Sequence, residues 1–404
     1  MKKIVTAVAT LLVLSNTPTF AQWQKVTDPS LNNVSNCLLS NKGKLYVAAN
    51  SGVFVSTDNG ETWTDTDSKS VSDGMAPKFL ASTANVIYAA GVSGGSGNYA
   101  SPLKYDGQHW TADTAGLPLA EIKTMFSDDN RIFIARVGNT ELCLYTKLDN
   151  ETRWTPVTSI PVPNAIFGMY KINNTYYAVT GGYKKIWSST DGVSFTETAS
   201  SVPSDVRTFF SAPGAVYFGS EHGLFKSTDG LTFNRIDAGF AAHPAVGLVG
   251  INAIHVSGNA VYASAVYSDS VYKSTDGGTT WSSISDGVLT NTVTSITMHN
   301  NAIFATQFTW GADKAPVIRY GTPSSGLFEK ASNPIQVTLH PNPSSGVVHV
   351  DVKENARLSL YNLAGTLQLN TTGNRMDVSG LAKGIYFLQV NTSAGKAIQK
   401  LLVE

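Results

Sequence analysis

The chain is poor in charged residues and has no excess of either sign. It has 404 residues, of which 29 are basic and 29 acidic, so charged residues make up 14% and the net charge is zero. Ordinary globular proteins carry about 25%. This balance, with no basic run longer than two residues, excludes a nucleic-acid binder and a polybasic membrane patch. Hydrophobic residues make up 42%, which excludes a disordered chain.

Cysteine is also scarce, and the seven histidines are scattered singly. There is no Cys-x-x-Cys and no His/Cys cluster, so the sequence predicts no metal site and no cofactor. The two cysteines, Cys37 and Cys143, fall two repeat units apart in the repeat described below. Because a disulfide needs Cα atoms within about 7 Å, we expect two free thiols.

Long apolar runs are missing, which predicts no integral membrane segment. The N-terminal run from Ile4 to Leu14 is too short to span a bilayer, which takes about 20 residues. It follows Lys2 and Lys3 and precedes Thr19-Phe20-Ala21. A positive start, an apolar centre and a small residue before the cleavage point are typical of a secretory signal peptide. We therefore predict a signal peptide at residues 1–21 and export of the mature chain.

An internal repeat organises most of the remaining chain. The segment Ser56–Trp63 recurs as Ser274–Trp281, and both fit Ser-x-Asp-x-Gly-x-Thr-Trp. Shorter copies lie at Ser189–Phe195 and Ser227–Phe233, and each copy follows a short alternating apolar run. These motifs resemble the Asp-box (BNR) repeat family of β-propellers. The resemblance implies an all-β fold in which each repeat is one four-stranded blade.

The aromatic residues that close the repeats give the number of blades. They are spaced by 40, 47, 44, 41, 38, 48 and 47 residues, and the eight of them bound seven intervals: Trp23, Trp63, Trp110, Trp154, Phe195, Phe233, Trp281 and Phe328. We therefore predict a seven-bladed propeller over residues 22–331. The strand around Trp23 completes blade 7 in our preferred interpretation, but the strand around Phe328 competes for the same place.

The boxes themselves are predicted to be structural turns. An Asp carboxylate can accept hydrogen bonds from the N–H groups of its own turn, and Gly supplies a positive φ. One Asp per turn does not supply the six to eight oxygens that calcium requires. The residues assigned this structural role are Asp58, Trp63, Asp191, Asp229, Asp276 and Trp281.

A second domain is predicted at residues 336–404. Its Pro341-Asn342-Pro343 start, the Tyr361–Gly365 turn, the Gly384–Val390 strand and the basic-apolar tail resemble the type IX (Por) secretion-system C-terminal sorting domain of Bacteroidota. The resemblance implies a small β-sandwich recognised by that machinery and delivery to the outer-membrane surface or the medium. Whether the product is anchored or released stays open, and a carbohydrate-binding or immunoglobulin-like sandwich is the alternative.

The propeller is interpreted as a binding module for a glycan or protein ligand. Variable loops on a rigid scaffold usually carry function, and in this architecture the loops between second and third strands share one face, here called the loop face. Aromatic rings with Ser and Gly make adaptable contact surfaces. The candidate ligand-binding residues are Tyr183, His222, Tyr267, Phe308 and Trp310.

Glycoside hydrolysis of an extracellular polysaccharide is the alternative function. Glu221, Asp269 and Asp313 are acids on the loops of three successive blades, and glycosidases use paired carboxylates. A sialidase is disfavoured, because that family gathers three Arg at its pocket and only Arg136 and Arg207 lie on the expected loop face.

Overall fold

A computed structural model describes most of the chain. The described residues are 22–26, 28–31, 35–71, 75–93, 101–118, 120–136, 144–161, 165–181, 184–242, 247–266, 270–285, 292–307, 317–321, 337–352, 356–362, 367–392 and 396–404. The chain folds into two compact units, one of which spans Gln22–Gly321. The described part of the other begins at Val337. The predicted signal peptide lies outside the described residues.

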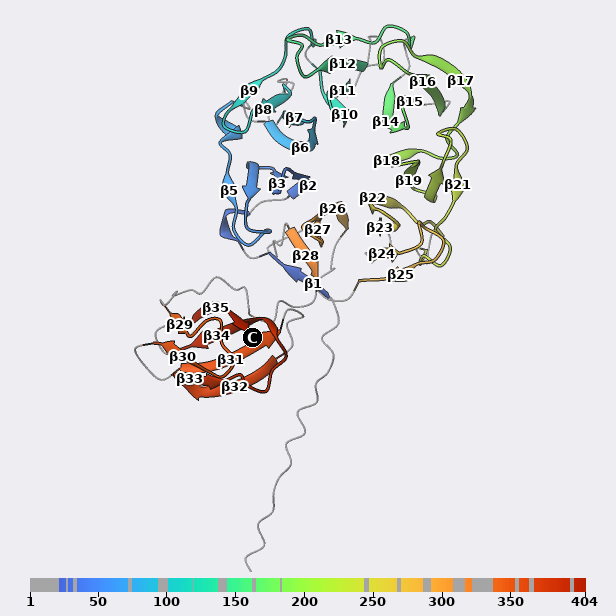
Figure 1. The fold of residues 1–404 in the computed structure, drawn as a ribbon. Coiled ribbons are helices and arrows are strands. Elements are labelled where there is room, and N and C mark those ends of the chain that lie inside the picture. The colour runs from blue at the N-terminus through green and yellow to red at the C-terminus, as the bar shows by residue number, and fades with distance from the viewer. Residues whose placement is uncertain are drawn as a thin grey trace, which may run out of the picture. The chain divides into compact units, whose positions relative to one another are not determined.

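The first unit is a ring of seven antiparallel four-stranded sheets (Figure 1). The predicted all-β, seven-bladed propeller is therefore confirmed. In blades 1 to 6 the strands follow one another outward from the centre of the ring in chain order. Alternating apolar side chains pack between neighbouring sheets, so the hydrophobic core is divided into seams between blades rather than gathered in one centre.

The blades, numbered in chain order, have the following strands. Blade 1 has β2 (Ser35–Asn41), β3 (Lys44–Ala49), β4 (Gly52–Ser56) and β5 (Thr64–Asp65), and blade 2 has β6 (Met75–Ser82), β7 (Ile87–Ser93), β8 (Leu103–Tyr105) and β9 (Trp110–Ala112). Blade 3 has β10 (Ile122–Ser127), β11 (Arg131–Arg136), β12 (Leu144–Leu148) and β13 (Thr155–Pro156), and blade 4 has β14 (Ile166–Ile172), β15 (Thr175–Thr180), β16 (Lys185–Ser189) and β17 (Thr196–Ser201).

The remaining blades follow the same plan. Blade 5 has β18 (Val206–Ala212), β19 (Ala215–Ser220), β20 (Gly223–Ser227) and β21 (Asn234–Arg235), and blade 6 has β22 (Ile251–Ser257), β23 (Ala260–Ala265), β24 (Ser270–Ser274) and β25 (Ser282–Ser283). Blade 7 has β26 (Val293–His299), β27 (Ala302–Gln307), β28 (Val317–Gly321) and, from the other end of the sequence, β1 (Gln22–Lys25). The short 3₁₀ helices η1 (Pro29–Leu31) and η2 (Ser68–Ser70) lie in connections.

The N-terminal strand closes the ring. β1 pairs antiparallel with β28, with Trp23 opposite Tyr320, and becomes the outer strand of blade 7. Figure 1 shows this blue strand beside the orange strands of the last blade. Of the two strands that competed for this position, the one around Trp23 occupies it, and Phe328 lies outside the described residues. Closure gives blade 7 its fourth strand and buries the apolar faces of blades 1 and 7 that an open ring would expose to water.

The indole rings fasten neighbouring blades by a repeated hydrogen bond. In blades 2, 3, 6 and 7 the closing Trp donates its Nε1–H to a residue that directly follows the outer strand of the preceding blade. The bonds are Trp110 to Thr66 Oγ1 at 2.9 Å, Trp154 to Asp113 O at 2.9 Å, Trp281 to Ile236 O at 2.7 Å and Trp23 to Ile284 O at 2.7 Å. The Phe that closes blades 4 and 5 has no such donor, so those seams depend on packing alone at this position.

The Asp boxes form compact turns between the third and fourth strands. In blade 4, Asp191 accepts hydrogen bonds from the N–H groups of Ser194 at 2.7 Å and Val193 at 2.8 Å, and from the Ser189 hydroxyl at 2.7 Å. These hydrogen bonds hold the pKa of Asp191 well below its ordinary value. Asp58, Asp229 and Asp276 accept hydrogen bonds from their own turns in the same way.

The C-terminal domain packs two antiparallel sheets around its own core. One sheet has the order β29 (Thr338–His340), β30 (Val347–Asp351), β33 (Arg375–Asp377), and the other has the order β32 (Leu367–Gly373), β31 (Ala356–Asn362), β34 (Gly384–Asn391), β35 (Lys396–Val403). The alternating inward residues of these strands, such as Leu358, Leu388 and Leu401, are fully buried.

The Pro-Asn-Pro motif at the start of this domain holds the last strand. The side-chain amide of Asn342 donates to the Lys400 carbonyl at 2.7 Å, and its Oδ1 accepts the Leu402 N–H at 2.9 Å. The Asn342 amide thus makes the two hydrogen bonds that a neighbouring strand would otherwise make to these backbone groups of β35. This geometry requires both a donor and an acceptor, which explains why asparagine suits the position.

We expect that replacing Trp23 will destabilise the whole propeller. Trp23 is 1% exposed and packs in the seam between blades 6 and 7. Trp23→Ala should lower the free energy of unfolding by about 3–5 kcal/mol, because it leaves a large cavity in the closing seam. Trp23→Phe is the matched control, and it should cost less because it keeps most of the packing and loses only the bond to Ile284. Denaturant unfolding measures both, and equal losses would contradict the packing argument.

The box aspartates should stabilise the fold without contributing to ligand binding. Asp58→Ala should lower the free energy of unfolding by about 1–3 kcal/mol, because the Thr62 N–H and the Ser56 hydroxyl lose their acceptor. Ligand affinity below the melting temperature should not change, since the boxes lie on the face opposite the loop face. A large loss of affinity in a folded Asp58→Ala protein would make the box a binding site.

The same turns should make stability depend on pH. Because the pKa of Asp191 is lowered in the folded state, its stabilising effect is present above the unfolded pKa of about 4 and is lost as pH falls through the folded pKa. The stability difference between wild type and Asp191→Asn should therefore be largest near neutral pH and shrink below about pH 4. Unfolding curves at several pH values measure this stability difference. Asp129→Asn is the control, because Asp129 is an exposed residue of another turn.

Candidate functional site

Every blade carries one β-bulge at the same place in its innermost strand. The pairing of the first and second strands shifts register near the start of the first strand, at the end that meets the loop face. A bulge leaves one residue without a partner and re-aims its side chain. We call the seven residues at these positions the bulge ring: Asn36, Lys78, Lys123, Phe167, Arg207, Asn252 and Thr294.

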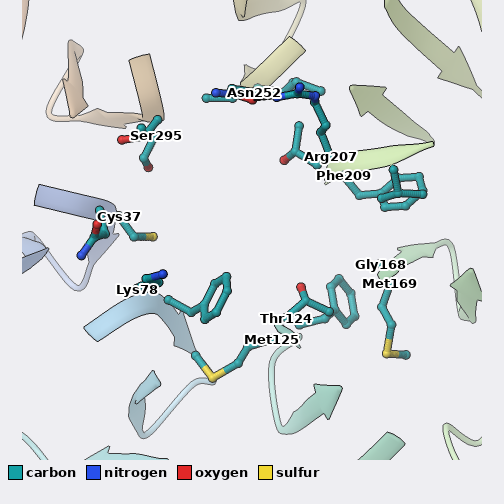
Figure 2. A pocket seen from close by; sticks show the side chains of 18 of the residues that line it. Cys37, Lys78, Thr124, Met125, Gly168, Met169, Arg207, Phe209, Asn252 and Ser295 are labelled. Atoms are coloured by element: carbon teal, nitrogen blue, oxygen red, sulfur yellow. Dashed lines mark hydrogen bonds between the residues drawn. The ribbon is translucent and has the colours of Figure 1, made fainter. Parts of the chain in front are cut away.

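The bulge ring surrounds the mouth of a central cavity. The cavity has a volume of about 340 Å³ and is lined by residues from all seven innermost strands. Figure 2 shows the labelled side chains arranged around this opening, among them Lys78, Arg207 and Asn252 from the ring. A volume of this size lies at the lower end of the range typical of small-ligand sites.

Small residues below the ring keep the cavity open. The position that follows each bulge residue is occupied by Cys37, Phe79, Thr124, Gly168, Thr208, Ala253 and Ser295. Six of these seven side chains are short, so the innermost strands cannot fill the centre at this depth. The next position along these strands carries larger side chains that also line the cavity, namely Met125, Met169, Phe209, Ile254 and Ile296.

The charged side chains that line the cavity are cations. Lys78 and Arg207 line the cavity, and the described residues that line it include no Asp or Glu. Asn36, Thr124, Asn252, Thr294 and Ser295 add neutral hydrogen-bonding groups. This lining favours neutral polar or anionic ligand groups over cationic ones.

Phe167 forms an exposed aromatic platform at the mouth. Its side chain is one of the few large apolar groups on the described surface, with 40% exposure. Lys123 Nζ lies 5.5 Å from the ring centroid, which is within cation–π range. The ring rests against Gly181, where a Cβ atom would come within 2.2 Å of Phe167 Cε2. A glycine at this position therefore seats the ring and pre-organises its open face.

Arg207 is held at the mouth by two neighbours. Its guanidinium donates to Asn252 Oδ1 at 2.7 Å and to Glu221 Oε1 at 2.5 Å. Asn252 is the bulge residue of the next blade, so this hydrogen bond joins two members of the ring. Glu221 belongs to the turn between β19 and β20, which connects a loop residue to the cavity lining through one ion pair.

Cys37 carries a free thiol on the innermost strand of blade 1, where it lines the cavity. Burial among the surrounding strands raises the pKa of this thiol. A thiol with a raised pKa is mostly protonated at neutral pH and is a poor nucleophile. Cys143 lies outside the described residues.

The structure describes two of the loop residues that the sequence singled out. Glu221 pairs with Arg207, and His222 is exposed with its Nδ1 2.8 Å from Ser204 Oγ. The other candidates lie outside the described residues, namely Tyr183, Tyr267, Phe308 and Trp310 for binding and Asp269 and Asp313 for catalysis. Within the described ranges, no group of three or more His, Cys, Asp or Glu side chains could hold a metal ion.

Sequence reasoning did not find the bulge ring, although the sequence contains a signal for it. When the seven innermost strands are aligned on their bulges, one column reads Asn, Lys, Lys, Phe, Arg, Asn, Thr. The column before it is mostly Ile or Val, and the column after it is mostly small. Long polar or aromatic side chains in such a column indicate a role outside the core.

Comparisons with known families agree with this architecture. A family described as the secretion system C-terminal sorting domain matches residues 338–404, and a DUF6242 beta propeller domain matches residues 4–132. No curated protein matches the chain. No helix among the described residues is long and apolar enough to cross a membrane.

Several solved structures share the fold at low sequence identity. A GH74 xyloglucanase from Xanthomonas campestris has a TM-score of 0.55 at 15% identity, with 82% of this chain and 59% of the other covered. YCF48 bound to D1 peptide has a TM-score of 0.52 at 12% identity, with 75% and 94% covered. The extracellular domain of the putative hybrid two-component system BT4673 from B. thetaiotaomicron has a TM-score of 0.55 at 13% identity, with 94% of this chain and 46% of the other covered.

This chain spans less than two thirds of the xyloglucanase and of the BT4673 domain. At these identities the likeness shows the fold alone. The C-terminal domain implies recognition by the type IX secretion machinery and export across the outer membrane to the cell surface or the medium. The chain is thus a β-propeller protein that carries a type IX secretion C-terminal sorting domain.

Proposed function

We propose that the exported propeller is a binding module that takes a glycan or protein ligand at the loop-face mouth of its central cavity. The observation that carries this proposal is the bulge ring. It presents an exposed aromatic platform, cations and neutral amides around one opening. Such a mixture suits hydrogen bonding to hydroxyl, amide or carbonyl groups together with stacking on an apolar surface.

The loop residues predicted from the sequence extend this site outward. His222 lies beside Glu221, which contacts the ring through Arg207. Tyr183, Tyr267, Phe308 and Trp310 belong to loops of blades 4, 6 and 7 on the same face. In our proposal these aromatic side chains form an outer rim that contacts the parts of a ligand too large for the cavity.

Two structural neighbours illustrate what this architecture can do. One is a xyloglucanase, and the other, YCF48, is bound to a peptide. They support the proposal only in showing that such a propeller can serve either kind of ligand, because one fold hosts many functions.

Glycoside hydrolysis is the second candidate, and Glu221 is the residue that favours it. Its carboxylate forms an ion pair with the Arg207 guanidinium, which lines the cavity, so the acid is held close to the mouth. A hydrolase would need a second carboxylate within about 5–9.5 Å. Asp269 and Asp313 are the candidates for that partner.

The domain boundaries and the sorting role complete the proposal. In this proposal residues 1–21 are the signal peptide and residues 336–404 are the segment that the secretion machinery recognises. The propeller is predicted over residues 22–331, and its compact unit is Gln22–Gly321. Whether the exported protein is anchored or released depends, in this proposal, on how the C-terminal segment is processed after export.

The aromatic platform gives a test of the binding site. Phe167→Ala should weaken ligand binding by about 1–3 kcal/mol, because the stacking surface at the mouth is lost. Val193→Ala is the matched control, since Val193 is 36% exposed on the box face of the same blade and should not affect binding. A glycan array and a protein-capture screen identify the ligand, and calorimetry measures both variants. Equal affinity of the two variants would place the site elsewhere.

Glu221→Gln distinguishes the two candidate functions. A binding module should keep most of its affinity in this variant and should cleave no polysaccharide. A hydrolase should lose turnover while it still binds its substrate. A screen of polysaccharide hydrolysis with the wild-type chain precedes this measurement, and Asp269→Asn and Asp313→Asn are assayed beside it.

The C-terminal domain gives a test of sorting. A chain that ends at Lys330 should fold and remain in the periplasm of a host with a type IX system, because it lacks the recognised segment. Fusion of residues 336–404 to a periplasmic reporter is the reciprocal control and should bring that reporter to the surface. Cell fractionation measures both, and surface delivery of the truncated chain would refute the sorting role.

A further inference from the structure

Arg136 occupies a position where the other blades carry neutral side chains. It ends the second strand of blade 3 and pairs with Ile122, directly before the bulge residue Lys123. The equivalent residues, read from the same register in the other six blades, are Ala49, Gly91, Thr180, Ser220, Ala265 and Gln307. Blade 3 alone has a charged side chain at this position, so the fold itself does not require one.

The guanidinium of Arg136 is buried without a counter-charge among the described residues. Arg136 is 4% exposed, and its Cζ lies 5.5 Å from the ring centroid of Tyr145. Among the described residues, no carboxylate lies within ion-pair distance of the Arg136 guanidinium. Its Nε has no hydrogen-bond partner among them either. The ring of Tyr145 offsets part of the charge but accepts no N–H bond in the plane of the guanidinium.

The other buried cation of the same seam is treated differently. Lys147, in the third strand of blade 3, is 1% exposed and forms an ion pair with the buried Asp113 of blade 2. In the seam between blades 2 and 3, Lys147 is therefore paired with a carboxylate of the protein, whereas Arg136 has no such partner among the described residues. A buried charge without a partner is strongly destabilising, and arginine cannot escape by losing its proton.

A small cavity adjoins Arg136 on the side of the loop face. Its volume is about 10 Å³, close to the space that one water molecule or a small ion needs. Apolar side chains such as Pro102, Leu117 and Ile134 form most of its wall, and Ser101 and Thr114 are its neutral polar members. Among the described residues that line it, Arg136 is the one charged group, so the cavity is matched to an anion.

We propose that Arg136 forms an anion-binding site in the seam between blades 2 and 3. It takes one small monovalent anion, either a free halide or the carboxylate group of a larger ligand. The guanidinium supplies the charge and the N–H donors, and the apolar wall excludes water. This site is separate from the mouth of the central cavity, and it does not depend on the function proposed for that mouth.

The test compares the wild type with Arg136→Gln. Glutamine is the residue that blade 7 carries at the equivalent position, Gln307. Chloride is titrated into the full-length chain at constant ionic strength, with methanesulfonate as the larger balancing anion. An anion that binds only the folded state should raise the melting temperature of the wild type by about 2–4 °C per tenfold increase once the site fills. Arg136→Gln should show no such rise and should be at least as stable as the wild type without chloride.

Matched variants make the result specific. Arg235→Gln removes a guanidinium whose Nε already pairs with Asp237 Oδ1 at 2.6 Å, so it should keep the wild-type response to chloride. Arg136→Lys keeps the charge and should keep part of the response. Acetate in place of chloride distinguishes the two sources, because a rise with acetate as well supports a carboxylate site and a rise with chloride alone supports a halide site.

Crystals soaked in sodium bromide give a direct readout. Anomalous scattering should show bromide against the Arg136 guanidinium in the wild type and not in Arg136→Gln. The proposal is overturned if the two proteins respond equally to chloride and acetate, or if bromide binds only elsewhere. Glu141 follows Arg136 closely in the sequence but lies outside the described residues. The proposal is also overturned if Glu141→Gln lowers the melting temperature of the wild type but not that of Arg136→Gln, because the chain would then supply its own counter-charge.

Discussion

The pairing of the first described strand with the last strand of the propeller is the interaction on which the rest of that domain depends. β1 meets β28 across nearly the full length of the propeller sequence, and Trp23 locks this pair to the preceding blade. Each blade packs against its two neighbours in the ring, so an open ring would leave two apolar sheet faces in water. The central cavity exists only inside the closed ring, since its wall takes residues from all seven innermost strands.

The structural groups and the candidate functional groups lie at opposite ends of each blade. The boxes satisfy their hydrogen bonds within single turns on one face, and the indole rings bridge successive outer strands. Because these interactions hold the blades together, the bulge residues are not needed for core packing. The bulges can therefore vary from Asn to Phe to Arg around the ring while the blades keep the same pairing, which is how a repeated scaffold acquires one irregular surface.

Two arginines near the loop face show how local partners decide what a cation can do. Arg207 has Glu221 and Asn252 beside it, so its charge is compensated and its position is fixed. Arg136 is more deeply buried and has only the face of Tyr145 among the described residues. The first is suited to positioning at the mouth of the cavity, whereas the second has hydrogen-bonding capacity left for a ligand. Export by the sorting domain brings both to the outside of the cell or its surface.

The sequence alone determined the number of blades, the chemistry of their turns and the presence of the sorting domain. These features depend on residues two to four positions apart, such as Asp191 with Val193 and Ser194, so they leave a local pattern that can be read directly. Tertiary structure decided which strand closes the ring, which residues line the cavity and which buried cation lacks a partner. Those outcomes depend on interactions between distant residues, such as Trp23 with Ile284 or Leu38 with Ser295, and no local pattern reports them.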